Sequence, residues 1–294
     1  MVIKMFYCFL ISKKNLILSF YVIIALFTSI VAYAAKNTQN EIDGITVPII
    51  MYHSISQNTS RLGKYVVSPE TIENDISFLK QNGYETIFIS DLIRYVYDDV
   101  PLPEKPVILS FDDGYYNNIV YLPEILKKYN AKATIAVVGE FTDKFSEADS
   151  HNVNFSHLTW EDLQAVSKSE YFEVSNHTYN MHSTDGRVGC FKLKNETDEQ
   201  YKENLTSDIM KMQKALEEKA NIKCTVFTYP YGKTCDSSVD IIKEMGFKAS
   251  LSCYERLNTI TKDKNCLYLL GRYNRPYNIS TEKFMKKMKI YQNK

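Results

Sequence analysis

Short apolar segments alternate with amphipathic ones along most of this chain, and this alternation restricts the fold more than any other feature. The apolar runs are residues 47–52, 84–89, 106–111, 132–138, 171–175, 224–229, 247–252 and 266–270. Several are rich in β-branched residues and apolar on both faces, which is typical of strands buried on both sides. We therefore expect strands at these positions.

Amphipathic stretches with helix signals lie between the runs. Residues 69–81 have an apolar face, Ser68 as the expected N-cap and Gly83 just after the end. Further helices are expected over residues 159–166, 199–219 and around 239–245, whereas the polar stretches 139–154 and 183–198 are expected to be surface loops. Strand–helix alternation over about 250 residues predicts one parallel α/β domain, either a barrel or a doubly wound sheet.

The N-terminal segment resembles an export signal. Lys13 and Lys14 precede an apolar stretch from Leu16 to Ala35, and Ala32-Tyr33-Ala34 fits a small-x-small cleavage site. The stretch is also long enough to cross a bilayer, which takes about 20 apolar residues. Residues 1–35 are thus expected to be a cleaved signal or a membrane anchor, 36–45 a linker and 46–294 the folded domain. The domain is expected to be exported, either secreted or anchored at the outer face of the cytoplasmic membrane, with no other membrane contact.

Charge and cysteine content set further limits. Lys and Arg number 35, as do Asp and Glu, so the chain lacks the basic excess of a nucleic-acid-binding protein. Five cysteines follow the N-terminal segment, and none has the C-x-x-C spacing of a zinc knuckle. Export permits disulfides. A disulfide between Cys253 and Cys266 is one possibility, and free thiols at all five positions are the other. The sequence sets no oligomeric state.

Polar side chains able to do chemistry directly follow several of the predicted strands. His53 follows the first run, Asp112 and Asp113 follow 106–111, His177 follows "FEVSN", and Tyr231 follows "VFTYP". The carboxyl ends of parallel strands meet at one edge of a sheet or barrel, where sites assemble. These residues are therefore expected to lie together.

A carboxylate and two imidazoles form a common three-ligand set for a divalent metal ion. His177 and His182 are five residues apart, so they do not share a helix face and should lie on a turn after the strand. One carboxylate of the pair Asp112–Asp113 can bind the metal while the other accepts a proton, its ionised form favoured by the cation. Taken singly, each histidine could equally be a loop or surface residue, and Asp-Asp-Gly could be a turn.

These residues resemble the motifs of the polysaccharide deacetylase family, also called the NodB homology domain or carbohydrate esterase family 4. "SFDDG" (110–114) is similar to its first motif, usually T-F-D-D-G, "HTYNMH" (177–182) to its second, and "YPYG" (229–232) to its third. The resemblance extends over residues 47–275 and implies a distorted parallel (β/α)7-type barrel. The H-x-x-x-x-H spacing and "MYH" (51–53) are most similar to the circularly permuted poly-N-acetylglucosamine deacetylase branch.

The resemblance implies a role for each matching residue. Asp113, His177 and His182 would bind the metal, most commonly Zn²⁺ with Co²⁺ or Ni²⁺ as alternatives, which polarises a water and the acetyl carbonyl. Asp112 would be the general base and His53 the acid that protonates the leaving amine. Pro230 and Tyr231 would form the substrate and oxyanion site, with the Tyr231 N–H as donor.

The chain departs from the family pattern at Thr228, where an Arg that orients the base is usual. Arg272 is a candidate replacement, and Arg275 a weaker one. The expected function is metal-dependent removal of N-acetyl groups from an extracellular N-acetylglucosamine polymer. The alternatives are an inactive, glycan-binding cell-wall protein of the same fold and, from the two-His-one-carboxylate set alone, a non-haem iron oxygenase. The sequence leaves peptidoglycan, poly-N-acetylglucosamine, chitin-like oligomers and O-acetylated xylan open as substrates.

Overall fold

The computed structural model describes residues 24–25, 28–29, 44–148 and 151–291, and the account below concerns the compact unit Gly44–Lys294. In chain order, its strands are β1 (Ile45–Val47), β2 (Ile49–Tyr52), β3 (Ser54–Ile55), β4 (Val66–Val67), β5 (Glu85–Thr86), β6 (Pro106–Phe111), β7 (Ala133–Val137), β8 (Phe172–Asn176), β9 (Val226–Thr228), β10 (Ala249–Leu251), β11 (Asn258–Ile260) and β12 (Tyr273–Asn274). The helices are α2 (Pro69–Gln81), α3 (Ile89–Asp98), α4 (Tyr116–Tyr129), α5 (Gly139–Ala148), α6 (Trp160–Val166), α7 (Asp198–Ala220), α8 (Asp236–Glu244) and α9 (Thr281–Lys287), with short 3-10 helices η1 (Thr59–Arg61), η2 (Pro230–Gly232) and η3 (Lys264–Leu267).

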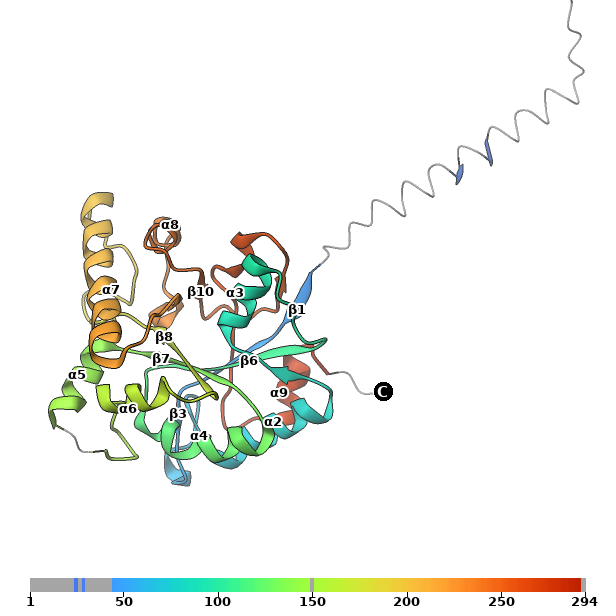
Figure 1. Cartoon of the computed structure of the whole chain (residues 1–294), viewed down its shortest axis with the longest axis horizontal. Helices are drawn as coiled ribbons and strands as arrows, with labels where there is room; N and C mark the ends of the chain where they lie inside the picture. Colours follow the sequence, from blue (N-terminus) through green and yellow to red (C-terminus); the bar gives the residue numbers. More distant parts are fainter. Residues whose placement is uncertain (1–23, 26–27, 30–43, 149–150, 292–294) are drawn as a thin grey trace, which may run out of the picture. The chain divides into compact units, whose positions relative to one another are not determined.

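The main sheet has the strand order β10-β9-β8-β7-β6-β2-β12, with β5 beside β6. Each of these neighbours pairs in parallel, as in Ile49↔Ile108 between β2 and β6. The sheet curls into a partly closed barrel, and helices lie on both sides of the central strands (Figure 1). This arrangement confirms the predicted distorted (β/α)7-type barrel over the doubly wound alternative.

Strand β6 shows how the two faces of the sheet differ. All six of its residues are buried. Val107, Leu109 and Phe111 pack with residues of α2, α4 and α6, whereas Ile108 packs with residues of β1, β2, β9 and β10. Because side chains alternate along a strand, Ser110 and then Asp112 continue the second face, toward the inside of the barrel.

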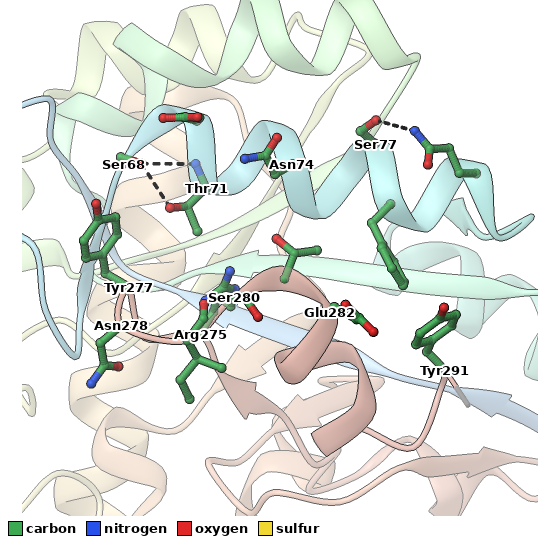
Figure 2. A pocket seen from close by; sticks show the side chains of 15 residues that line it. Ser68, Thr71, Asn74, Ser77, Arg275, Tyr277, Asn278, Ser280, Glu282 and Tyr291 are labelled. Atoms are coloured by element: carbon green, nitrogen blue, oxygen red, sulfur yellow. Dashed lines mark hydrogen bonds between the residues drawn. The ribbon is translucent and has the colours of Figure 1, made fainter. Parts of the chain in front are cut away.

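The helix signals read from the sequence are confirmed where capping residues define them. The Ser68 hydroxyl accepts the Thr71 N–H at 3.1 Å and begins α2 (Figure 2). Thr159 forms a capping box with Asp162 at the start of α6, as Thr197 does with Gln200 at the start of α7. These caps satisfy amide groups that would otherwise lack partners in the first turn.

Two local predictions are wrong. Residues 266–270 were expected to be a strand, but η3 ends at Leu267 and the segment contributes only a bridge between Leu270 and Leu251. Asp263 caps η3 by accepting the Asn265 N–H at 2.9 Å, and Leu269 has φ +55°, which is incompatible with a continuous strand.

The second error concerns residues 139–154, which were expected to form a loop. Helix α5 occupies residues Gly139–Ala148. Phe141 and Phe145, four residues apart on one helix face, both lie against the His157 ring. This narrow apolar contact supports a helix in an otherwise polar stretch.

The N-terminal predictions remain predictions. Apart from residues 24–25 and 28–29, the expected signal or anchor at 1–35 lies outside the described residues, as does most of the 36–45 linker. Within the described part of the chain, no helix has both the length and the apolar character needed to cross a membrane.

Candidate active site

The carboxyl ends of four strands bring the chemically active side chains into one cleft. His53 follows β2, Asp112 and Asp113 follow β6, His177 follows β8, and η2 with Tyr231 follows β9. The cleft has a volume of about 520 Å³. Its lining residues are Met51, His53, Lys64, Tyr65, Asp112, Asp113, Tyr115, His177, His182, Tyr231, Cys253, Glu255 and Asn274.

Three of the lining residues form a set of potential metal ligands. One ligand atom from each of Asp113, His177 and His182 lies within 4.8 Å of the other two. The Asp113 Oδ1 is 3.0 Å from the His182 Nε2 and 3.6 Å from the His177 Nε2. Burial opposes ionisation of Asp113, but its contacts with the two imidazoles hold its pKa well below the ordinary value.

The orientation of both imidazoles fits a metal ion at this point. The His177 Nδ1 is 2.7 Å from the carbonyl oxygen of Thr228, and the His182 Nδ1 is 3.3 Å from the Tyr231 hydroxyl. Nδ1 of each ring therefore has a polar partner outside the ligand set, and each Nε2 faces Asp113. Such outer hydrogen bonds fix the tautomer and direction of metal-binding histidines. The donor chemistry of one carboxylate and two imidazoles is that of Zn²⁺, Co²⁺ or Ni²⁺.

Asp112 points the other way, into the barrel, and pairs with Arg272. The guanidinium donates to both carboxylate oxygens, Nη1 to Oδ1 at 2.6 Å and Nη2 to Oδ2 at 2.9 Å. Arg272 is fully buried, and its Nε–H donates to the Ser252 carbonyl at 2.8 Å. Burial favours the neutral form of Asp112, but the charge and hydrogen bonds of Arg272, together with the imidazoles of His177 and His53, outweigh it and lower the pKa of this carboxyl.

The other arginine considered, Arg275, lies elsewhere. Its Nε–H donates to the Asp75 Oδ2 at 2.7 Å in a second buried ion pair beside α2. Thr228, at the position where an Arg is usual, uses its hydroxyl to contact the Ser175 hydroxyl at 2.9 Å. The guanidinium beside Asp112 therefore comes from the segment before β12 rather than from β9.

One ring nitrogen of His53 forms no hydrogen bond within the described protein. Its Nδ1 is buried without a hydrogen-bond partner, and its ring lies 4.8 Å from that of Tyr65. Burial lowers the pKa of this imidazole, and the nearby Asp112 and Asp113 only partly oppose the shift. The Asn274 Oδ1, at the same cleft, is also buried and unpartnered. Such atoms in a cleft indicate a polar ligand or ordered water.

The η2 turn places Tyr231 at the mouth of the cleft. Tyr231 has φ +57° and a side chain that is 42% exposed. No described backbone group accepts its N–H, so this donor remains available to a ligand. Pro230 is buried behind it and does not line the cleft.

His157 also lies at the site, although no sequence pattern indicated it. Its Nδ1 is 2.7 Å from the Asp113 carbonyl oxygen, and its ring stacks on Tyr115 with centroids 4.6 Å apart. Burial lowers its pKa, which suits a neutral ring donating from Nδ1. Because His157 lies in the loop before α6 rather than at a strand end, only the fold brings it to Asp113.

A cavity of about 870 Å³ lies apart from these groups, between α2 and the segment that leads into α9 (Figure 2). Polar side chains such as Asn74, Tyr277 and Asn278 surround it. None of the buried, unpartnered polar atoms of the described residues lies there. We therefore assign the chemistry to the smaller cleft.

The five described cysteines are all free, so Cys253 and Cys266 are not paired.

The sequence profile of the polysaccharide deacetylase family matches residues 99–250. The poly-beta-1,6-N-acetyl-D-glucosamine N-deacetylase of Escherichia coli K12 is 26% identical over 219 residues, covering 67% of this chain and 32% of the relative. The enzyme of the same name from Staphylococcus aureus MRSA252 is 25% identical over 217 residues, covering 72% and 69%. The chain thus spans about a third of the E. coli relative.

Solved structures agree with the fold. A de-N-acetylase from Aggregatibacter actinomycetemcomitans superposes with a TM-score of 0.64 at 26% identity, covering 81% of this chain and 96% of that one. A Streptococcus pyogenes deacetylase in complex with acetate gives 0.66 at 22% identity, covering 83% and 99%. The second likeness concerns the fold alone.

Proposed function

Because this chain belongs to the polysaccharide deacetylase family, we propose that it is a metal-dependent hydrolase that removes N-acetyl groups from a polysaccharide containing N-acetylglucosamine. The main supporting observation is the division of the carboxylate pair, with Asp113 facing two imidazoles and Asp112 facing a guanidinium in the same cleft. The names of the relatives favour a β-1,6-linked N-acetylglucosamine polymer among the substrates that the sequence left open.

We propose that Asp113, His177 and His182 hold the metal ion. When bound, a divalent cation would supply a Lewis acid that polarises the acetyl carbonyl and lowers the pKa of a nearby water. The contacts of the two Nδ1 atoms with the Thr228 carbonyl and the Tyr231 hydroxyl orient both rings so that their Nε2 atoms face Asp113.

Asp112 is proposed as the general base. Arg272 occupies one lone pair on each carboxylate oxygen, and each oxygen retains another that can accept a proton. The lowered pKa keeps the carboxylate ionised at neutral pH. The bidentate contact also fixes its direction, which matters because a general base must lie within hydrogen-bond reach of the proton it takes.

The remaining roles follow from position. The free N–H of Tyr231 is suited to donate to the oxyanion that forms when water adds to the amide carbon. His53, with its buried and unpartnered Nδ1, is the proposed acid. Asp112 takes a proton from the water as a C–O bond forms to the water oxygen; the C–N bond then breaks, and His53 in its protonated form gives a proton to the departing amine. The products are acetate and a free amino sugar.

Acetate release tests this proposal. Wild type, Asp112→Asn and His53→Gln are compared on N-acetylated oligomers of β-1,6-linked, chitin-like and peptidoglycan type and on O-acetylated xylan, with added Zn²⁺, Co²⁺ or Ni²⁺. We expect metal-dependent release by wild type and at least a 100-fold lower rate for each variant, since acid–base groups contribute about 10²–10⁴-fold. Asp240→Asn, on the exposed surface of α8, is the matched control. Full activity after metal removal, or in Asp112→Asn, would contradict the mechanism.

The alternatives gain no support from the site. An inactive glycan-binding protein was suggested by Thr228 in place of the usual Arg, and Arg272 supplies a guanidinium to Asp112 instead. An oxygenase would leave the buried Asp112–Arg272 pair unexplained. Export, and hence an extracellular substrate, is proposed from the N-terminal sequence alone.

A further inference from the structure

The turn that bears both histidines is held by hydrogen bonds from two helices. On one side, the start of α5 donates to its carbonyls: the Gly139 N–H to Thr178 at 3.1 Å, and the Glu140 N–H to Tyr179 at 2.8 Å. Gly139 lies so close to this turn that a Cβ there would be 2.4 Å from the Tyr179 ring. The helix expected to be a loop thus forms one wall of the turn.

On the other side, Asp208 of α7 accepts the N–H groups of the same turn. Its Oδ1 accepts the Tyr179 N–H at 2.8 Å, and its Oδ2 accepts the Asn180 N–H at 2.8 Å. Both carboxylate oxygens are therefore directed to two consecutive amides that lie between His177 and His182. An aspartate matches this pair of donors because it offers two acceptor oxygens, whereas an asparagine offers one.

The turn requires such support. Thr178 has φ +72°, a left-handed conformation that is unfavourable for a β-branched residue and persists only where the surroundings impose it. His177 is also fixed by its strand and by the Thr228 carbonyl. His182 lies at the far end of the turn, and both hydrogen-bonding contacts of its ring, to Asp113 and Tyr231, are made by the side chain alone. Its ring also lies near those of His177 and Phe141. The position of its Nε2 therefore depends on the path of the turn.

Asp208 has no cation to neutralise it among the ion pairs of the described residues. Lys211, one turn further along α7, lies over the Tyr179 ring with its Nζ 3.6 Å from the centroid. The hydrogen bonds of the Asp208 carboxylate thus go to backbone amides, and the charge of Lys211 acts on it without forming an ion pair. A carboxylate of α7 whose two oxygens both accept amides of this turn indicates a role in the geometry of the turn.

We propose that Asp208 is a positioning residue for the metal site, which fixes the spacing of His177 and His182 by holding the backbone between them. The proposal rests on the proposed function in that it takes these histidines as ligands. Outer residues that orient ligands typically change metal affinity by about 10–100-fold when replaced. Replacement of Asp208 is expected to weaken metal binding by a factor in this range.

The test compares wild type with Asp208→Asn, which keeps the size of the side chain but removes one acceptor, and with Asp208→Ala. Glu203→Gln, on the exposed side of the same helix, is the control. Zn²⁺ affinity is measured by competition with a chromophoric chelator. Amide hydrogen exchange is measured on the intact metal-free protein and read out for residues 177–182. We expect Asp208→Asn to bind Zn²⁺ at least ten-fold more weakly and to exchange the Tyr179 and Asn180 amides faster, with no change in Glu203→Gln.

The outcomes separate this proposal from the general one. If wild type binds Zn²⁺ and Asp208→Asn binds it equally well, the positioning role is refuted while the proposed function stands. If wild type does not bind Zn²⁺, Co²⁺ or Ni²⁺, both are refuted. A lower melting temperature of Asp208→Asn with unchanged affinity and exchange would make Asp208 merely structural and also refutes the proposal.

Discussion

Replacing Arg272 by Met should both destabilise the protein and shift its activity to higher pH. The side chain of Arg272 is fully buried and that of Asp112 is 4% exposed, so the variant leaves a buried carboxylate without a counter-charge. Breaking a buried ion pair by removing one partner costs about 3–5 kcal/mol. At about 2–4 °C per kcal/mol for a domain of this size, the melting temperature should fall by about 10 °C. Arg94→Met, which breaks a pair whose arginine is 55% exposed, should cost less than about 1 kcal/mol.

The pH dependence of this variant has a definite sign. In wild type, the lowered pKa of Asp112 contributes stability that is present above the unfolded value of about 3.9 and is lost as pH falls through the folded pKa. Without Arg272, burial dominates and raises the pKa. Protonation then stabilises Arg272→Met as pH falls, so the gap to wild type should narrow toward pH 4.

Activity should move in the corresponding direction, because the proposed base works only when ionised. The acidic limb of kcat/KM against pH should lie higher in Arg272→Met than in wild type, measured by acetate release with saturating metal. Chemical denaturation at pH 7 and pH 4 gives the stability difference. An unchanged acidic limb together with a melting temperature within 2 °C of wild type, roughly the effect of a surface substitution, would refute this account of the pair.

Two further predictions concern the ligand set and the packing of α5 against the turn that bears both histidines. Zn²⁺ at about 100 times its dissociation constant should stabilise wild type by about 2.7 kcal/mol and so raise its melting temperature in a thermal shift assay. Asp113→Ala should abolish this rise, whereas Asp112→Ala should keep most of it. Equal responses of the two variants and wild type would mean that "SFDDG" is only a turn. Gly139→Ala should lower the free energy of unfolding by about 1–3 kcal/mol in chemical denaturation, because its Cβ would lie 2.4 Å from the Tyr179 ring. The control Gly63→Ala, whose Cβ would have nothing within 4 Å, should change it by less than about 0.5 kcal/mol. Equal losses in the two variants would contradict the tight packing at Gly139.

The parts of the site that the sequence predicts are those tied to strand ends. Asp112, Asp113 and His177 each follow a buried strand, and parallel pairing in register brings such ends together whatever the loops do. Local caps such as Ser68 are equally readable, because donor and acceptor lie within one turn of the chain.

Other parts depend on contacts between distant segments. His157 reaches Asp113 from a loop, and Asp208 reaches the turn at Tyr179 from a helix 29 residues away in sequence; no local pattern encodes either contact. The strand expected over 266–270 failed because apolar composition does not reveal the cap at Asp263 or the left-handed Leu269. Helix α5 was missed because its buried residues, Gly139 and Thr142, are not large apolar ones, and its two phenylalanines are only half-buried.

The adjacent carboxylates show how sequence and fold combine. Repulsion between Asp112 and Asp113 would be costly if both faced one apolar space. Asp112 continues the inner face of β6 and pairs with Arg272, whereas Asp113 adopts φ +74° and is followed by Gly114 at φ +65°. Two consecutive left-handed residues end the alternation of the strand and turn the second carboxylate to the imidazoles. Each charge thus has its own counter-group, so one can stay available as a base while the other serves as a ligand.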